Sequence, residues 1–296
     1  MADGRQWGRS GPDRDPGAGP ARFPRGLSAL SPRRRRFVLI AAAVVALAVI
    51  VALLPTVINK LTQSVPSGYP AQSDPGPVLL VPGYGGSTDS LTTLADRIRA
   101  TGRQAIVVQL PDSATGDLDA QADVLDEAVS SALRNASSVD IVGYSAGGVV
   151  TRLWTEQHDG AAKARRVVTF GSPYHGTSIA GAADALDPGV CPTACQQLVP
   201  NSSLLTQMNA TALAGHPPWL SLWTTQDQTV VPPTSADLPG ALDVPLQSIC
   251  AGDTASHGGL PTDPLVIGIV LQALSGSSLT APTASQCTSL KSLGGG

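Results

Sequence analysis

Residues 139–148 have the sequence VDIVGYSAGG, a short apolar run that ends in a glycine-rich turn around one serine. The apolar run predicts a buried strand, and the residues after the turn continue as an apolar stretch of helical length to about Trp154. A Gly-x-Ser-x-Gly turn between a strand and a helix is typical of a sharp bend that presents a serine hydroxyl. Ser145 is therefore predicted to be a nucleophile; the alternative is an ordinary glycine-rich turn.

Outward from this turn, short apolar runs alternate with longer amphipathic stretches. Strands are expected at 78–81, 105–108, 139–142, 166–170, 219–223 and 246–250, and helices at 91–100, 118–133, about 146–154 and from about residue 264. This alternation predicts an α/β fold, with a mostly parallel sheet and helices on both faces. Catalytic groups should follow the carboxyl ends of the strands. Residues 174–218 lack the pattern and are expected to form an insertion or a partial lid.

A serine nucleophile needs a base, and the chain contains four histidines. His257 follows the last predicted strand in the sequence ASHGG, where a base belongs if the order along the chain is serine, acid, histidine. His175, in GSPYHGT, is the competing candidate, but no acid-bearing strand separates it from Ser145. His158 and His216 are expected to be surface or loop residues. The predicted base is therefore His257.

The imidazole in turn needs a carboxylate that orients it and stabilises its cation. Asp227 lies just past the predicted strand at 219–223, in the sequence TQDQTVVP, and is the predicted acid. Asp243 and Asp253 are the alternatives. Because Asp253 lies only four residues before His257, it could orient the histidine loop instead.

Two backbone N–H groups are expected to stabilise the oxyanion of the transition state. One belongs to Ala146, at the start of the helix after Ser145, where the helix dipole favours negative charge. The other belongs to Tyr84, in the loop PGYGG at residues 82–86. The alternative for this loop is phosphate binding, but it lacks the Gly-Lys-Ser/Thr ending and the Gly-x-Gly-x-x-Gly spacing of such turns.

The N-terminal segment has a different composition. Four arginines at 33–36 precede residues 37–54, which contain no charge, glycine or proline. At about 1.5 Å per residue this run covers roughly 27 Å, close to the hydrocarbon thickness of a bilayer. A transmembrane anchor or uncleaved signal is therefore expected at 37–58, in a single-pass protein of the cell membrane whose catalytic domain lies outside. Secretion after signal cleavage is the alternative.

The expected organisation is a disordered basic cytoplasmic tail at 1–36, the anchor at 37–58, a linker at 59–77 and a catalytic domain at 78–296. Residues 1–59 carry nine arginines and three aspartates, so the net charge of −3 leaves −9 for the rest of the chain. An acidic body repels a phosphate backbone, and nucleic acid is therefore not expected as a partner. The sequence does not predict the oligomeric state.

The four cysteines suit an oxidising compartment. Of the three possible connectivities, the local pairing Cys191–Cys195 together with Cys250–Cys287 is the one expected. Free buried thiols are the alternative. A zinc site is not expected, because no second pair of cysteines or histidines has ligand spacing.

Five motifs occur along the chain in the order VPGYGG, GYSAGG, GSPYHGT, DQTVVP and SHGG. In this combination, over roughly residues 77–275, the chain resembles bacterial lipases and esterases of the α/β-hydrolase superfamily, in particular compact secreted triacylglycerol lipases. Two departures stand out. Pro82-Gly83 replaces the His-Gly that such lipases usually have, and the predicted anchor is unusual among exported lipases.

The resemblance implies an α/β-hydrolase fold and serine-dependent hydrolysis of carboxylic esters through an acyl-enzyme on Ser145. It implies Asp227 and His257 as acid and base and Tyr84 and Ala146 as oxyanion donors, with no metal or organic cofactor. The expected partner is a small-molecule ester or lipid, with the membrane contacted through residues 37–58. The alternatives are an acyltransferase or thioesterase with the same triad, or a non-catalytic binding module on a hydrolase scaffold.

Overall fold

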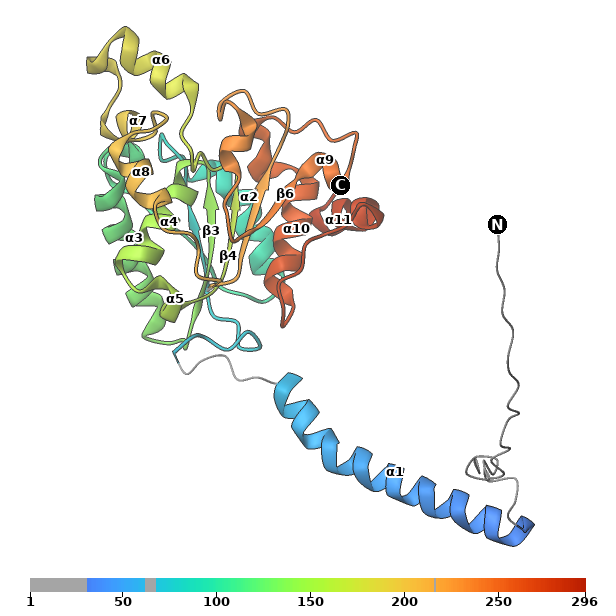
Figure 1. Cartoon of the computed structure of the whole chain (residues 1–296). Helices are drawn as coiled ribbons and strands as arrows, with labels where there is room; N and C mark the ends of the chain where they lie inside the picture. The colour runs from blue at the N-terminus through green and yellow to red at the C-terminus, as the bar shows by residue number, and fades with distance from the viewer. Residues whose placement is uncertain (1–30, 62–67, 216) are drawn as a thin grey trace, which may run out of the picture. The chain divides into compact units, whose positions relative to one another are not determined.

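The computed structural model describes residues 31–61, 68–215 and 217–296 (Figure 1). Contacts within the chain divide it into two units, Met1–Gln63 and Ser64–Gly296. The predicted tail at 1–36 lies mostly outside the described residues, as does part of the predicted linker at 59–77.

The first unit contains helix α1 (Pro32–Leu61). In the part of the chain that the structure describes, no helix has the length and apolar character needed to cross a membrane. The predicted anchor at 37–58, and the single-pass membrane location that followed from it, are wrong by this finding. The prediction rested on the apolar letters of residues 37–54, and such a run does not by itself give a helix the length and apolar character that a membrane crossing requires.

The second unit is built on a six-stranded sheet in the order β2-β1-β3-β4-β5-β6. Every neighbouring pair of strands is parallel. The strands are β1 (Val78–Val81), β2 (Ala105–Val107), β3 (Val139–Tyr144), β4 (Ala164–Phe170), β5 (Trp219–Trp223) and β6 (Leu242–Pro245). The expected mostly parallel sheet is confirmed.

Helices cover both faces of this sheet, with α3, α4 and α8 on one side and α2, α10 and α11 on the other (Figure 1). The α-helices are α2 (Asp89–Ala100), α3 (Leu118–Leu133), α4 (Ala146–Gln157), α5 (Gly160–Lys163), α6 (Ser178–Leu186), α7 (Thr193–Gln197), α8 (Ser203–Asn209), α9 (Leu246–Ile249), α10 (Pro264–Ser275) and α11 (Cys287–Gly294). Short 3₁₀ turns are η2 (Pro111–Ala114), η3 (Pro188–Val190), η4 (Pro233–Ala236), η5 (His257–Thr262) and η6 (Ala284–Gln286).

Two hydrophobic cores, one on each face of the sheet, explain the continuous apolar runs of the central strands. Val78 and Leu80 belong to the core beneath α2 and α10, whereas Leu79 and Val81 belong to the core beneath α3 and α4. Successive side chains of a strand point to opposite faces, so a strand that is covered on both faces must be apolar at every position.

The sixth strand differs from its prediction. Residues 246–250 were expected to form a strand, but Leu246–Ile249 is helix α9 and the strand β6 precedes it, ending at Pro245. The polar Asp243 interrupts the apolar pattern of β6 and conceals it in the sequence. Asp243 is tolerated because β6 is an edge strand, where its carboxylate accepts a hydrogen bond from Trp223 Nε1 at 3.1 Å.

Residues 174–218, expected to be an insertion or partial lid, contain helices α6, α7 and α8. The disulfide Cys191–Cys195 lies in this region, and Cys250–Cys287 ties α9 to the start of α11. Both predicted pairings are confirmed. The alternative of free thiols is excluded among the described residues, which contain no free cysteine.

Removing the disulfide Cys250–Cys287 by a double substitution to alanine is expected to lower the free energy of unfolding by about 4 kcal/mol, because a long loop loses its constraint in the unfolded chain. Its two cysteines are 37 residues apart, compared with a separation of 4 for Cys191 and Cys195. The same double substitution at the shorter loop should cost about 2 kcal/mol and serves as the control. Urea denaturation measures both values, and an equal loss in the two variants would contradict this account.

Candidate active site

The serine turn sits at the carboxyl edge of the sheet, between the end of β3 and the start of α4. Ser145 has φ 53° and ψ −127°, a left-handed conformation that residues other than glycine rarely adopt. Its N–H donates to the Phe170 carbonyl at 3.0 Å, which ties the turn to the end of β4. Strain of this kind persists only where the surrounding structure enforces it, and here it presents the serine side chain at the sheet edge.

The glycines of the turn are required by packing. A Cβ atom added at Gly147 would lie 2.3 Å from the Val81 carbonyl oxygen, and one added at Gly148 would lie 1.9 Å from Ser172 Oγ. At Gly143 the added atom would lie 2.9 Å from the Gly147 carbonyl oxygen. The α4 helix therefore lies so close to β1 and to the loop after β4 that positions 143, 147 and 148 have no room for a side chain.

The structure brings together the three residues predicted as nucleophile, base and acid. His257 Nε2 lies 2.9 Å from Ser145 Oγ, and His257 Nδ1 lies 2.7 Å from Asp227 Oδ2. His257 and Asp227 are only 7% and 5% exposed, which shields their contact from water. A carboxylate at Nδ1 favours the tautomer with its proton on that nitrogen, so that Nε2 can accept the serine proton.

Asp227 is held by its own loop. Its Oδ1 accepts hydrogen bonds from the N–H groups of Thr229 at 2.9 Å and Val230 at 2.8 Å. These bonds leave Oδ2 for His257 and stabilise the ionised carboxylate. The acid therefore faces the imidazole in one orientation.

The competing carboxylates have other partners. Asp243 pairs with Trp223, and burial raises the pKa of its carboxyl group. Asp253 accepts a hydrogen bond from the Ala255 N–H at 3.1 Å and forms an ion pair with Lys291 Nζ at 3.0 Å. Asp253 therefore shapes the loop that leads to His257, the role left open for it by the sequence.

The other histidines lie elsewhere. His175 Nδ1 is 3.5 Å from Asn209 Nδ2, and the residue lines a separate hollow of about 400 Å³ beside α8. His158 Nε2 lies 3.0 Å from a carboxylate oxygen of Asp123 at the protein surface. His216 lies outside the described residues.

The predicted oxyanion loop lies directly beside the serine. A Cβ atom added at Gly83 would be 2.8 Å from Ser145 Cβ and 3.4 Å from Ser145 Oγ. In residues 68–215 and 217–296, the N–H groups of Tyr84 and Ala146 donate to no other protein atom. Both donors therefore remain available to a substrate oxygen, and Pro82 does not prevent the close approach of the loop.

Four further residues that the sequence did not single out surround the acid and base. Gly171, at φ 61°, lies against the imidazole, because an added Cβ would be 3.2 Å from His257 Nδ1. The second residue, Thr224, donates from Oγ1 to the Ala255 carbonyl at 2.8 Å. The third, Gln247, donates from Nε2 to Thr224 Oγ1 at 3.0 Å, so that these two residues join the loops of the candidate acid and base. The fourth, Tyr144, donates from its hydroxyl to the His257 carbonyl at 3.1 Å. Such contacts join distant segments and leave no local sequence signal.

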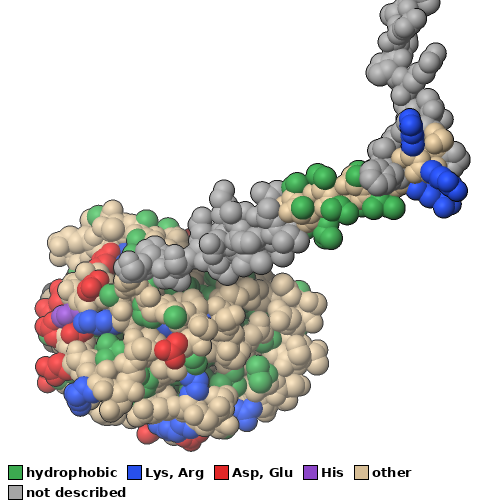
Figure 2. Space-filling model, turned by 90° about the horizontal axis from the view of Figure 1, so that it is seen from below, with side chains coloured by type: hydrophobic (Ala, Val, Ile, Leu, Met, Phe, Trp, Pro, Cys, Tyr) green, Lys and Arg blue, Asp and Glu red, His purple; other side chains and the backbone are tan. Residues whose placement is uncertain are grey.

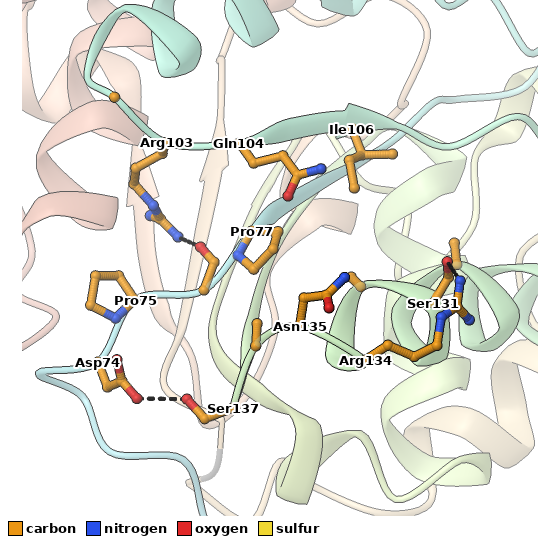
Figure 3. A pocket seen from close by; sticks show the side chains of 15 residues that line it. Asp74, Pro75, Pro77, Arg103, Gln104, Ile106, Ser131, Arg134, Asn135 and Ser137 are labelled. Carbon is orange, nitrogen blue, oxygen red and sulfur yellow. Dashed lines mark hydrogen bonds between the residues drawn. The ribbon is translucent and has the colours of Figure 1, made fainter.

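A cavity of about 820 Å³ lies at the other edge of the sheet (Figure 3). Its lining includes residues that precede β1, β2 and β3, whereas Ser145 follows β3. In it, Arg103 donates to the Gly76 carbonyl, and Asp74 accepts from Ser137 Oγ at 2.6 Å (Figure 3). The length of β3 places the amino and carboxyl ends of the strands roughly 20 Å apart. The cavity is therefore not part of the candidate active site.

Two further observations concern the distribution of charge and the possible metal ligands. On the face shown in Figure 2, acidic and basic side chains are interspersed over the second unit. Among the residues that the structure describes, no group of three or more His, Cys, Asp or Glu side chains has the arrangement of a metal site.

Comparisons with known proteins give one family match over part of the chain. A family model described as palmitoyl protein thioesterase matches residues 77–216, which include Ser145 but neither Asp227 nor His257. A sequence comparison with curated proteins returns no significant match.

Several solved structures are similar to this chain. Lipase B of Aspergillus fumigatus has a TM-score of 0.58 and 18% identity, over 78% of this chain and 63% of that one, so the match spans less than two thirds of the fungal lipase. The mature lipase BlEst2 of Bacillus licheniformis has a TM-score of 0.55 and 18% identity, over 71% and 95%. A Listeria innocua protein has a TM-score of 0.51 and 17% identity, over 71% and 97%.

The parallel sheet, the serine turn after β3 and these structural matches together define the α/β-hydrolase fold. Within that fold the chain is similar to bacterial and fungal lipases and esterases, and it shares a segment with the palmitoyl protein thioesterase model. The resemblance expected from the five motifs is confirmed at this level.

Proposed function

We propose that residues 78–296 form a serine hydrolase domain that cleaves carboxylic esters of apolar acyl groups. The observation that carries the proposal is the continuous contact from Ser145 through His257 to Asp227, with separations of 2.9 and 2.7 Å. A hydroxyl, an imidazole and a carboxylate in this order form the arrangement that activates a serine in acyl transfer.

In the proposed reaction, His257 Nε2 takes the proton of Ser145 Oγ as that oxygen attacks the ester carbonyl carbon. Asp227 stabilises the imidazolium, and the N–H groups of Tyr84 and Ala146 donate to the tetrahedral oxyanion. The intermediate collapses to an acyl-enzyme as His257 gives its proton to the departing alkoxide. Water, deprotonated by the same imidazole, then attacks the acyl carbon, releases the carboxylic acid and restores the Ser145 hydroxyl.

Two features of the site support catalysis over a purely structural contact. Ser145 is held at φ 53° and ψ −127°, and strained backbone conformations of this kind cluster at active sites. Two unpaired backbone donors beside the serine match the demand of a developing oxyanion, where removal of one donor costs about 10²- to 10³-fold in rate.

A thioester is the second candidate substrate, since the family model that matches residues 77–216 is named for palmitoyl protein thioesterases. The same attack on a thioester carbonyl would release a thiol in place of an alcohol. The names of the structural neighbours favour oxygen esters, as two of them are lipases.

The two disulfides favour a place outside the reducing cytosol, in agreement with secretion.

Labelling with a fluorophosphonate probe tests the proposal. The wild-type protein is expected to react at neutral pH and to lose its label in Ser145→Ala, because the probe traps only an activated serine. The control is Ser172→Ala, which changes a buried serine outside the contact chain and should label like the wild type. If the wild-type protein takes no label and hydrolyses no p-nitrophenyl ester, the proposed enzymatic function is refuted, and the alternative of a non-catalytic binding module is supported.

The substrate class requires a second measurement. An oxygen ester and a thioester with the same acyl chain should be compared by kcat/KM, and a series of acyl lengths then identifies the preferred chain. Preference for the oxygen ester supports the first proposal, whereas preference for the thioester supports the second. Transfer of the acyl group to an added alcohol faster than to water would identify an acyltransferase.

A further inference from the structure

Tyr144 occupies the variable position before the serine in the Gly-x-Ser-x-Gly turn and is the last residue of β3. Its ring contacts two others. The ring centroids of Tyr144 and Phe170 are 5.3 Å apart with planes at 28°, and those of Tyr144 and His257 are also 5.3 Å apart with planes at 32°. Phe170, which is fully buried, and the imidazole of His257 therefore both pack against the tyrosine ring.

The hydroxyl of Tyr144 makes a second contact with the same histidine. It donates a hydrogen bond to the His257 carbonyl oxygen at 3.1 Å. Burial raises the pKa of Tyr144 to about 12, and the nearby charge of Asp227 acts in the same direction. The phenol therefore stays protonated, and remains a donor, throughout the neutral pH range.

These contacts link the base to the nucleophile through one rigid element. Tyr144 and Ser145 are neighbours at the end of β3, and β3 is paired on both sides by β1 and β4. The loop that bears His257 comes from a distant part of the chain and has to be aligned with that strand. Alignment of this kind matters because a shift of about 1 Å in reacting groups can cost on the order of 10²-fold in rate.

We propose that Tyr144 is a positioning residue for His257: its ring supports the imidazole face and its hydroxyl fixes the histidine backbone, so that Nε2 stays aligned with Ser145 Oγ. The proposal rests on the proposed roles of Ser145 and His257. It assigns to the variable residue of the turn a function in the alignment of the base.

The test compares Tyr144→Phe with Tyr174→Phe. Both substitutions remove one hydroxyl from a tyrosine that is largely or fully buried, but the Tyr174 hydroxyl donates to Thr169 Oγ1 at 2.8 Å and has no bond to His257. Tyr144→Phe is expected to lower kcat and the rate of fluorophosphonate labelling by roughly 5- to 50-fold with KM within twofold, because orientation is lost without loss of binding. Tyr174→Phe should leave kcat within twofold, whatever its melting temperature.

A second variant, Phe170→Leu, keeps Tyr144 intact but removes the aromatic ring that packs against it. It should lower kcat in the same direction by a smaller factor, and it provides a test even if Tyr144→Phe does not fold. The proposal is overturned if kcat is unchanged in Tyr144→Phe or Phe170→Leu, if only KM rises, or if Tyr174→Phe loses as much activity as Tyr144→Phe. Failure of the wild type to label would instead overturn the proposed function itself, together with the positioning role.

Discussion

Replacing His257 by alanine is expected to lower kcat for ester hydrolysis by about 10³- to 10⁶-fold, with little change in KM, because Ser145 then has no base. The imidazole is the only group that the structure places within 2.9 Å of Ser145 Oγ as a proton acceptor among the described residues. Water cannot replace it, since the serine hydroxyl is a poor nucleophile until its proton is removed.

The double variant Ser145→Ala with His257→Ala sharpens this test. If the two residues act as one unit, the double variant should be no slower than the worse single variant. His175→Ala is the matched control, because this histidine lies beside Asn209 without contact to Ser145, and its kcat should stay within about threefold. Losses that multiply in the double variant, or a His257→Ala protein within tenfold of the wild type, would contradict the proposed mechanism.

Replacing Gly147 by alanine is expected to lower the free energy of unfolding by more than about 3 kcal/mol, or to prevent folding, because the added methyl group has no space. It would meet backbone oxygens of two successive residues, at 2.3 Å from Val81 and 2.5 Å from Pro82. Relief would require α4 to move away from β1, which would also carry Ser145 away from the oxyanion loop. Activity should therefore fall with stability.

Gly252→Ala is the control for the loss of stability in Gly147→Ala, since an added Cβ at Gly252 has no neighbour within 4 Å. Its free energy of unfolding should stay within about 0.5 kcal/mol of the wild type. Chemical denaturation followed by circular dichroism measures both variants. A Gly147→Ala protein as stable as Gly252→Ala would show that α4 and β1 are less closely packed than in the structure.

Much of the sheet could be predicted because its strands are short, apolar and covered on both faces. The strands at 78–81 and 219–223 and the helix at 118–133 have the predicted bounds. The prediction failed at the edge of the sheet, where β6 is covered less completely and carries Asp243. The apolar residues of α9 led to the incorrect prediction of a strand there. Leu246 and Ile249 are three positions apart, a spacing that places both on one side of a helix.

The candidate residues could be selected because α/β folds place catalytic groups after strands, and the chain offers few serines, histidines and aspartates at such points. Sequence reasoning could also retain Asp253 as an orienting residue. It did not find the contacts of Gly171, Thr224 and Tyr144 around the candidate acid and base, because each contacts a segment far away in the chain. The anchor was predicted from a run of apolar letters, and that pattern alone did not meet the structural requirement for a membrane crossing.

The sequence by itself determined the periodicity of strands and helices, the glycines around Ser145 and the order of nucleophile, acid and base. All of these are local features, set by backbone conformation and by the alternation of side chains. Only the tertiary structure decided which of three carboxylates faces His257, what lies behind the imidazole and how closely the loop at 82–86 approaches the serine. These depend on distances between residues up to 113 positions apart, which only the packing of helices against the sheet establishes.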